Sequence, residues 1–304
     1  MNLFGKLRTP ATPVPAVSKS VRPADADLDL FGITHKGKVR AENQDHFLLC
    51  TVHPQVVIHA TSLPNPDSLP LRGTRLATVM LVADGVGGAA AGNEAARVAT
   101  ETITRYTSST LRSYHSAGGA GEQEFKKALE TAAFEAHGAV LAEASHRDDK
   151  RKMATTLTLA IAVWPRLFVV QVGDSRCYLF SGGTLKQVTR DQTVGQQLVD
   201  DGVMPRERLR DSPFSHVLAS ALGGDEARPV VTCVDVSDRG SVVFLCSDGL
   251  TKHVTDEEIA AGLKTMTSSE QVANQLLELA LQRGGSDNIT MVIGTAPLKR
   301  PAAS

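Results

Sequence analysis

Short apolar runs separated by turn-forming residues recur along most of the chain and predict strands. The run from Thr78 to Ala83 is apolar at nearly every position, which is typical of a strand buried on both faces. The pair Gly182-Gly183 predicts the turn of a hairpin. Together these patterns predict strands over residues 28–34, 46–51, 55–58, 78–83, 156–163, 167–172, 177–180, 230–236, 241–246 and 288–294.

Longer segments with apolar residues at helical spacing predict helices, the first of them with Asn93 as its N-cap. The predicted helices span residues 93–111, 122–145, 256–264 and 269–282, with short helices and loops over 191–224. The second helix has an apolar face that core packing explains, made of Phe125, Leu129, Ala132, Ala136 and Val140. Strands are grouped with strands and helices with helices, which favours an α+β fold with antiparallel sheets flanked by helix pairs.

The chain divides into one domain and two short ends. Residues 1–27 are rich in Pro, Ala and Ser and hold few apolar residues, so we predict a disordered tail there. The predicted domain covers residues 28–296, and a short C-terminal tail covers residues 297–304.

Composition narrows the class of protein. The chain has 304 residues, of which 42% are hydrophobic. Its formal net charge is −1, so there is no excess of basic residues that would indicate nucleic-acid binding. The four cysteines are widely spaced, which favours neither a zinc site nor disulfides and indicates a reducing compartment. No segment approaches the ~20 apolar residues that span a membrane, and no signal peptide is recognisable. We therefore expect a cytoplasmic protein without a membrane span.

Acidic residues stand at the ends of several predicted strands. Asp84, Asp174 and Asp248 each follow an apolar run, and Asp287 directly precedes one. Carboxylates that converge at one rim of a sheet repel each other unless cations lie between them. Because Mg²⁺ and Mn²⁺ favour carboxylate, carbonyl and water oxygens, the pattern predicts a hydrolytic site with several metal ions.

A loop between the first two predicted strands adds two candidate residues. Arg40 offers a planar set of donors that suits phosphate oxygens. Asp45 begins the second strand, where it could face the same cations. Taken alone, each of these motifs also fits an ordinary turn or helix cap.

Taken together and in this order, the motifs make the chain resemble the metal-dependent protein serine/threonine phosphatases of the PP2C (PPM) type, in a bacterial-style form. The resemblance covers residues from about 28 to 295. It rests on residues 40–45, 84–92, 155–157, 173–176, 220–223, 247–250 and 286–288.

The resemblance implies an αββα sandwich of two antiparallel sheets flanked by helix pairs. It also implies that Asp84 bridges two Mn²⁺ or Mg²⁺ ions, with the carbonyl of Gly85 on one of them and Asp248 and Asp287 completing the first. A third ion would bind Asp174 with Asp248, as in bacterial relatives. By the same resemblance Asp45 holds metal-bound waters, Arg40 grips the phosphate, and residues 191–224 form the flap that influences substrate choice.

The expected reaction is hydrolysis of phosphoserine and phosphothreonine in proteins by direct attack of a hydroxide shared by two metal ions. No residue suggests a covalent nucleophile. The expected partners are phosphorylated proteins, including the substrates or the autophosphorylated form of a Ser/Thr kinase. A monomer is expected because the sequence predicts no exposed apolar helix face that would bind a second subunit.

Three features depart from the family pattern. Gln44 stands where many relatives carry Glu, and Val86 stands where animal relatives carry a histidine proposed as general acid. A proton donor could then be a metal-bound water or one of the histidines His35, His46 and His216. The connection between Asp45 and Asp84 is long, which predicts a surface insertion near residues 53–73.

Two other functions compete with this hypothesis. Residues 85–90 fit the pattern G-x-G-x-x-A of dinucleotide-binding proteins, but that class also needs a parallel strand that ends in an acid ~20 residues later. A non-catalytic binding module with a degenerate phosphatase fold is the second alternative. The complete set of four strand-end aspartates favours an enzyme.

Overall fold

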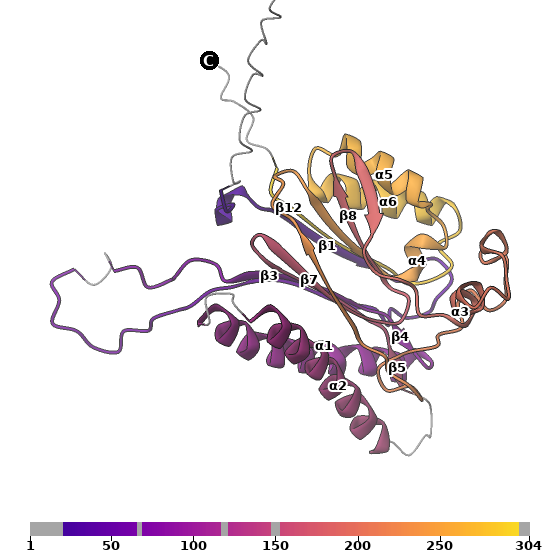
Figure 1. Ribbon diagram of the computed structural model, residues 1–304, viewed down its shortest axis with the longest axis horizontal. Coiled ribbons are helices and arrows are strands. Elements are labelled where there is room, and N and C mark those ends of the chain that lie inside the picture. Colours follow the sequence, from indigo (N-terminus) through magenta and orange to yellow (C-terminus); the bar gives the residue numbers. More distant parts are fainter. Residues whose placement is uncertain (1–20, 66–68, 117–120, 147–152, 298–304) are drawn as a thin grey trace, which may run out of the picture.

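The computed structural model describes residues 21–65, 69–116, 121–146 and 153–297. Two five-stranded antiparallel sheets lie face to face, and helices cover the outer face of each (Figure 1). This arrangement confirms the αββα sandwich. Residues 1–20 and 298–304, which hold most of the two predicted tails, lie outside the described residues.

The strands form two large sheets and one small one. The first large sheet contains, in spatial order, β1 (Asp29–His35), β12 (Ile289–Thr295), β11 (Val242–Cys246), β8 (Arg176–Ser181) and β9 (Thr184–Gln187). The second contains β10 (Val230–Asp235), β7 (Arg166–Val172), β6 (Leu157–Val163), β3 (Ala77–Ala83) and β2 (His46–Val52). The small sheet pairs β4 (Gly85–Val86) with β5 (Ala154–Thr155).

Two pairs of helices cover the two large sheets, and two shorter helices lie outside these pairs. They are α1 (Ala89–Ser116), α2 (Glu122–Ser145), α3 (Val194–Asp200), α4 (Asp248–Thr251), α5 (Asp256–Thr265) and α6 (Ser269–Gln282), with short 3₁₀ turns at η1 (Asp25–Asp27) and η3 (Arg206–Arg208). Figure 1 shows α1 and α2 on the outer side of the sheet that holds β3 and β7, and α5 and α6 on the other sheet. The predicted apolar face of α2 is buried.

Strand β3 shows why the apolar runs are continuous. Val79 and Leu81 pack toward α1 and α2, whereas Met80 and Val82 pack between the two sheets. Alternate side chains therefore enter two different cores, and neither face of the strand meets water. At about 1.5–3 kcal/mol for each large buried apolar side chain, such central strands contribute strongly to holding the layers together.

The start of α1 differs from the prediction. The helix begins at Ala89, so Asn93 lies inside it and does not cap it. The Asn93 side chain instead donates a hydrogen bond to the carbonyl oxygen of Asn43 (3.1 Å), which fastens the helix to the loop before β2. Gly87 and Gly88 have positive φ values and turn the chain into the helix.

The predicted strand at 156–163 forms as β6, which starts one residue later than expected, after Thr156. The Thr156 hydroxyl accepts a hydrogen bond from the Asp84 amide, which ties the break between β5 and β6 to the end of β3. The predicted strand at 55–58 is incorrect. Only an isolated bridge between Gln55 and Arg72 forms there, because prolines interrupt the segment. Figure 1 shows the connection from β2 to β3 as a long projection away from the layers, as expected for an insertion.

The described part of the chain begins at residue 21, so it includes the last seven residues of the segment predicted as a tail. Residues 25–27 form η1. The buried Arg75 side chain donates hydrogen bonds to Asp25 (2.6 Å) and to the carbonyl oxygen of Pro23 (2.9 Å). A buried guanidinium requires such acceptors, and they hold this segment in place.

All strand pairs in the described residues are antiparallel. The dinucleotide-binding alternative requires a parallel sheet, so the fold excludes it. Cys50, Cys177, Cys233 and Cys246 are free, and Cys177 and Cys246 are buried. Within the described part of the chain, no helix is long and apolar enough to cross a membrane.

Candidate metal centre

The predicted acidic residues converge at one end of the sandwich. The pKa of Asp84 is raised well above its usual range, mainly by burial and to a smaller extent by the nearby negative charges of Asp45, Asp248, Asp174 and Asp287. These residues come from segments as far apart in the sequence as β2 and β12, so only the packing of the two sheets brings them together. A concentration of negative charge of this kind favours the binding of cations.

The backbone around Asp84 is held by Thr155 of β5 and by Thr156, the residue that follows β5. Asp84 donates its amide to the Thr156 hydroxyl (3.0 Å), and its carbonyl accepts hydrogen bonds from the Thr156 amide and the Thr155 hydroxyl (both 2.9 Å). A side chain on Gly85 would collide with the backbone of Gly92 and Gln44. The close packing of α1 therefore requires glycine at position 85, in addition to any role of its carbonyl.

Asp45 lies deeper, between the two sheets. Its Oδ2 accepts hydrogen bonds from the hydroxyls of Ser247 (2.8 Å) and Thr290 (2.7 Å). Burial raises the pKa of Asp45 to about 6, against the effect of these two donors and with a further contribution from Asp248. The other oxygen, Oδ1, is buried and has no hydrogen-bond partner among the described residues.

Lys252 lies between two of the predicted metal ligands. Its ammonium is 2.7 Å from Asp248 Oδ2 and 2.6 Å from Asp287 Oδ2. Although burial raises the pKa of Asp287, the hydrogen bonds from Lys252 and Arg40 lower it overall. Asp248 begins α4, and its Oδ1 is buried without a hydrogen-bond partner in the described structure.

Arg40 forms a bidentate ion pair with Asp287. The distances are 2.8 Å from Nε to Oδ1 and 2.9 Å from Nη2 to Oδ2, and the Arg40 side chain is 52% exposed. Asn288 holds the loop that carries Arg40 by donating to the carbonyls of Lys36 and Glu42 and accepting from the Gln44 amide, all at 2.9 Å. The predicted phosphate-binding arginine is thus next to the acidic cluster and faces solvent.

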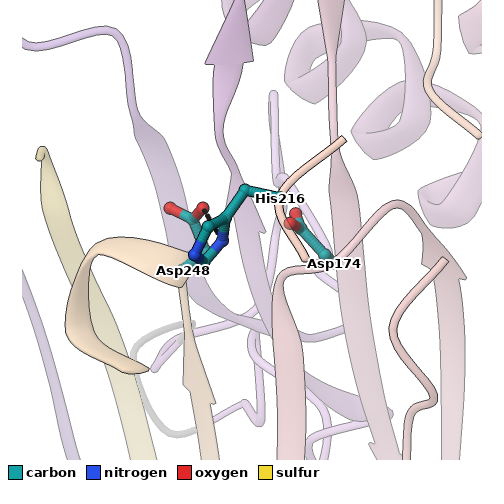
Figure 2. Close-up of side chains that lie close together, drawn as sticks. All are labelled: Asp174, His216 and Asp248. Atoms are coloured by element: carbon teal, nitrogen blue, oxygen red, sulfur yellow. Dashed lines mark ion pairs between the residues drawn. The ribbon is translucent and has the colours of Figure 1, made fainter. Parts of the chain in front are cut away.

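Asp174 lies on the side of the cluster that adjoins the flap. The pKa of Asp174 is raised well above its usual range, mainly by burial and to a smaller extent by the negative charges of Asp248 and Asp191. Figure 2 shows Asp174, His216 and Asp248 gathered from three separate segments. One potential ligand atom from each lies within 4.8 Å of the others.

The residues present fit a divalent cation. The donors are carboxylate oxygens, two of which are buried without a hydrogen-bond partner among the described residues. A buried polar atom without a partner is costly, and a bound cation would satisfy it. The raised pKa values of Asp84 and Asp174 have the same physical origin, which is negative charge held close together away from water.

The three histidines proposed as proton donors are in different environments. His35 accepts a hydrogen bond from the Gly37 amide and supports its own loop. His46 has a buried Nε2 with no hydrogen-bond partner in the described structure. His216 lies 3.7 Å from Asp248.

The two residues that depart from the family pattern also lie near the centre. Val86 is 41% exposed, and its side chain has no proton to donate. Gln44 is buried, and its backbone amide donates a hydrogen bond to Asn288.

Sequence reasoning missed two residues that organise this centre. Lys252 is four residues after Asp248 in SDGLTK, a spacing that places two side chains on one helix face and could have revealed it. Asn288 stands out in the sequence only as part of a motif, and no local signal reveals that it bonds to a loop more than 240 residues earlier.

Comparisons with known proteins identify the class. The family model described as Protein phosphatase 2C matches residues 58–283. The chain therefore belongs to the protein phosphatase 2C family, as the sequence motifs indicated.

Two curated relatives and one solved structure illustrate the match. The serine/threonine protein phosphatase PstP of Mycobacterium tuberculosis is 35% identical over 229 residues, which cover 75% of this chain and 41% of PstP. The serine/threonine phosphatase stp of Listeria welshimeri is 28% identical over 263 residues, covering 86% of this chain and 92% of that protein. A solved structure of the PstP catalytic domain in complex with two manganese ions superposes with a TM-score of 0.66 at 29% identity, over 88% of this chain and 97% of that one. The chain thus spans about two fifths of the length of PstP.

Proposed function

We propose that this protein is a metal-dependent phosphatase that hydrolyses phosphoserine and phosphothreonine in other proteins. The observation that supports it best is the convergence of Asp45, Asp84, Asp174, Asp248 and Asp287 at one end of a protein phosphatase 2C fold. The names of both curated relatives specify the same activity for those proteins.

The proposed metal ligands are the side chains of Asp84, Asp248 and Asp287 and the carbonyl of Gly85, for two Mn²⁺ or Mg²⁺ ions. Asp174 with Asp248 would hold a third ion, and Asp45 would act through metal-bound waters. The manganese ions of the PstP structure support this choice of metal. Cations bound here would lower the pKa of water and offset the charge of the reacting phosphate.

The protein's own side chains supply binding and orientation. Arg40 is half exposed, so its guanidinium can exchange the Asp287 carboxylate for the phosphate oxygens of a substrate. Ser247 and Thr290 orient the Asp45 carboxylate through their hydroxyls. Substrate would enter beside the flap, in a cleft lined by Arg206, Arg210 and His216 on one side and α5 residues on the other.

The biological setting follows from this chemistry. We propose that the protein acts in signalling, in the cytoplasm and as a monomer, and that its substrates are proteins phosphorylated by a Ser/Thr kinase, including the kinase itself. The names of the relatives support phosphoprotein substrates.

Hydrolysis of a phosphothreonine peptide with Mn²⁺, with and without a chelator, tests the function. The wild-type protein should be active only with metal, and Asp84→Asn should abolish activity while circular dichroism shows an unchanged fold. A folded wild-type protein with no activity at any Mn²⁺ concentration would favour the binding-module alternative.

A further inference from the structure

A histidine from the flap lies against two acidic residues of the centre. His216 Nδ1 is 3.7 Å from Asp248 Oδ2, and its side chain is 55% exposed. Figure 2 shows the imidazole directed at the Asp248 carboxylate, with Asp174 on its other side. Each of the three residues offers a ligand atom, and these atoms all lie within 4.8 Å of one another.

The backbone beside His216 is held on both sides. The carbonyl of Phe214 accepts a hydrogen bond from the Gly195 amide (2.9 Å), and the carbonyl of Val217 accepts one from the Val194 amide (2.8 Å). Both donors belong to the first turn of α3. These bonds fix the part of the flap backbone that carries His216.

The spacing of the three side chains suits one cation. Ligand atoms on an octahedral ion with bonds of about 2.1 Å lie roughly 3–4 Å apart. The His216–Asp248 distance of 3.7 Å is within that range, and the full set, within 4.8 Å, needs only a small inward movement of the flap. Asp248 Oδ1 is buried and has no hydrogen-bond partner among the described residues, so it is free to take a ligand.

We infer that His216 is a ligand of the third cation, so that this ion bridges the flap and the rest of the metal centre. The inference rests on the proposed function, in which Asp174 and Asp248 hold that ion. The imidazole adds a nitrogen donor to two carboxylates. Imidazole suits transition-metal ions better than Mg²⁺, so this position should select Mn²⁺ over Mg²⁺.

A cation at this position would also restrain the flap. The flap carries Arg206, Arg208 and Arg210, which are exposed and are sites for cleavage by trypsin. Binding that joins His216 to Asp174 and Asp248 should reduce local opening of this segment. Protection from trypsin therefore reports the contact without reference to catalysis.

The experiment compares the wild-type protein with His216→Ala, Asp174→Asn and the control His59→Ala, whose histidine is exposed outside the flap. Calorimetric titration with Mn²⁺ and with Mg²⁺ gives the number and affinity of sites, and trypsin cleavage at residues 206–210 is followed with and without Mn²⁺. His216→Ala should weaken the weakest Mn²⁺ site by at least about tenfold, a typical cost of disturbing a metal ligand shell. It should also remove the Mn²⁺-dependent protection, as Asp174→Asn should, whereas His59→Ala should match the wild type.

Unchanged Mn²⁺ affinity and protection in His216→Ala would overturn the inference. Equal weakening of Mn²⁺ and Mg²⁺ would overturn the claim of selectivity. Hydrolysis of phosphothreonine peptide by the same wild-type sample separates this result from a failure of the proposed function. A protein that needs metal for hydrolysis but ignores the loss of His216 would keep the function and lose the ligand.

Discussion

Lys252 places a positive charge between Asp248 and Asp287, two carboxylates that we propose as metal ligands. Although burial opposes it, Asp248 and Asp287 raise the pKa of Lys252 above its usual value, so the ammonium remains charged at neutral pH. A divalent cation bound by the same carboxylates must replace these contacts and tolerate the nearby ammonium.

Replacing this lysine should therefore tighten metal binding. We predict that Lys252→Met binds Mn²⁺ about tenfold more tightly than the wild type, which corresponds to ~1.4 kcal/mol, because a competing and repelling charge is removed. Calorimetric titration of the metal-free protein with Mn²⁺ gives the affinity. Lys264→Met, which changes an exposed lysine at the end of α5, is the matched control. Weaker binding in Lys252→Met would show that the ammonium supports the metal-bound site.

The buried Asp45 carboxylate predicts a pH dependence of stability in the metal-free protein. Its pKa is about 6 in the folded state against an ordinary value of 3.8, so the folded state binds the proton more tightly than the unfolded state. The contribution of Asp45 to the free energy of unfolding is therefore present in full below about pH 4 and is lost as the pH rises through 6. The shift corresponds to a contribution on the order of 3 kcal/mol.

Asp45→Asn should remove this contribution, since an amide does not ionise. Between pH 4 and pH 7, the free energy of unfolding of the wild type should fall relative to that of the variant by up to about 3 kcal/mol. Urea unfolding in the presence of a chelator measures both. Asp201→Asn, at an exposed position after α3, should run parallel to the wild type. Parallel curves for wild type and Asp45→Asn would contradict the raised pKa.

At the scale of elements, the centre depends on two loops that pack on each other. The loop from β1 to β2 carries Arg40, and the loop from α6 to β12 carries Asp287. Asn288 joins them through hydrogen bonds to three backbone groups. Gly37 is required at their contact, because it has a φ of 77° and a side chain there would collide with the backbone of Asp287.

Asn288→Ala should loosen this contact. It leaves the amide of Gln44 and two carbonyls without their partner, and we predict a loss of about 2–4 kcal/mol of stability. Arg40 should lose its alignment, so KM for a phosphothreonine peptide should rise. Chemical unfolding and steady-state kinetics measure the two effects. Asn274→Ala, which changes an exposed asparagine on α6, should be close to neutral. A neutral Asn288→Ala would show that the loops hold their positions without it.

For the whole molecule, the two ends of the sandwich have different roles. The acidic residues lie at the end where β3 and β11 finish and β12 starts. The opposite end is closed by residues 21–28, which contact Arg75 through Asp25 and Pro23. Arg75 is 7% exposed, so its charge relies on these acceptors.

Two truncations separate these contributions. Deleting residues 1–20 removes none of the described contacts and should leave unfolding and Mn²⁺-dependent hydrolysis unchanged. Deleting residues 1–27 leaves the buried Arg75 without Asp25 and Pro23 and should cost about 1–3 kcal/mol. Thermal unfolding of the two truncated proteins measures the difference. Equal stability would show that solvent replaces both acceptors.

Much of the fold could be predicted because its signals are local. The helices at 122–145 and 269–282 have the predicted bounds, since their apolar faces repeat along the chain. The predicted start of α1 is wrong because Asn93 resembles a cap in sequence, whereas its hydrogen bond goes to a distant loop. The predicted strand at 156–163 starts one residue late for a related reason, since the Thr156 hydroxyl accepts a hydrogen bond from the distant Asp84 amide.

The sequence by itself determined which faces of the strands are buried and where carboxylates end them, because hydrophobic period and strand ends are properties of neighbouring residues. Tertiary structure alone decided that Lys252 lies between Asp248 and Asp287, that Asn288 holds the Arg40 loop, and that His216 faces Asp174. Several of these contacts join residues tens to hundreds of positions apart. Their geometry is set by how two sheets and a flap pack, which no local pattern encodes.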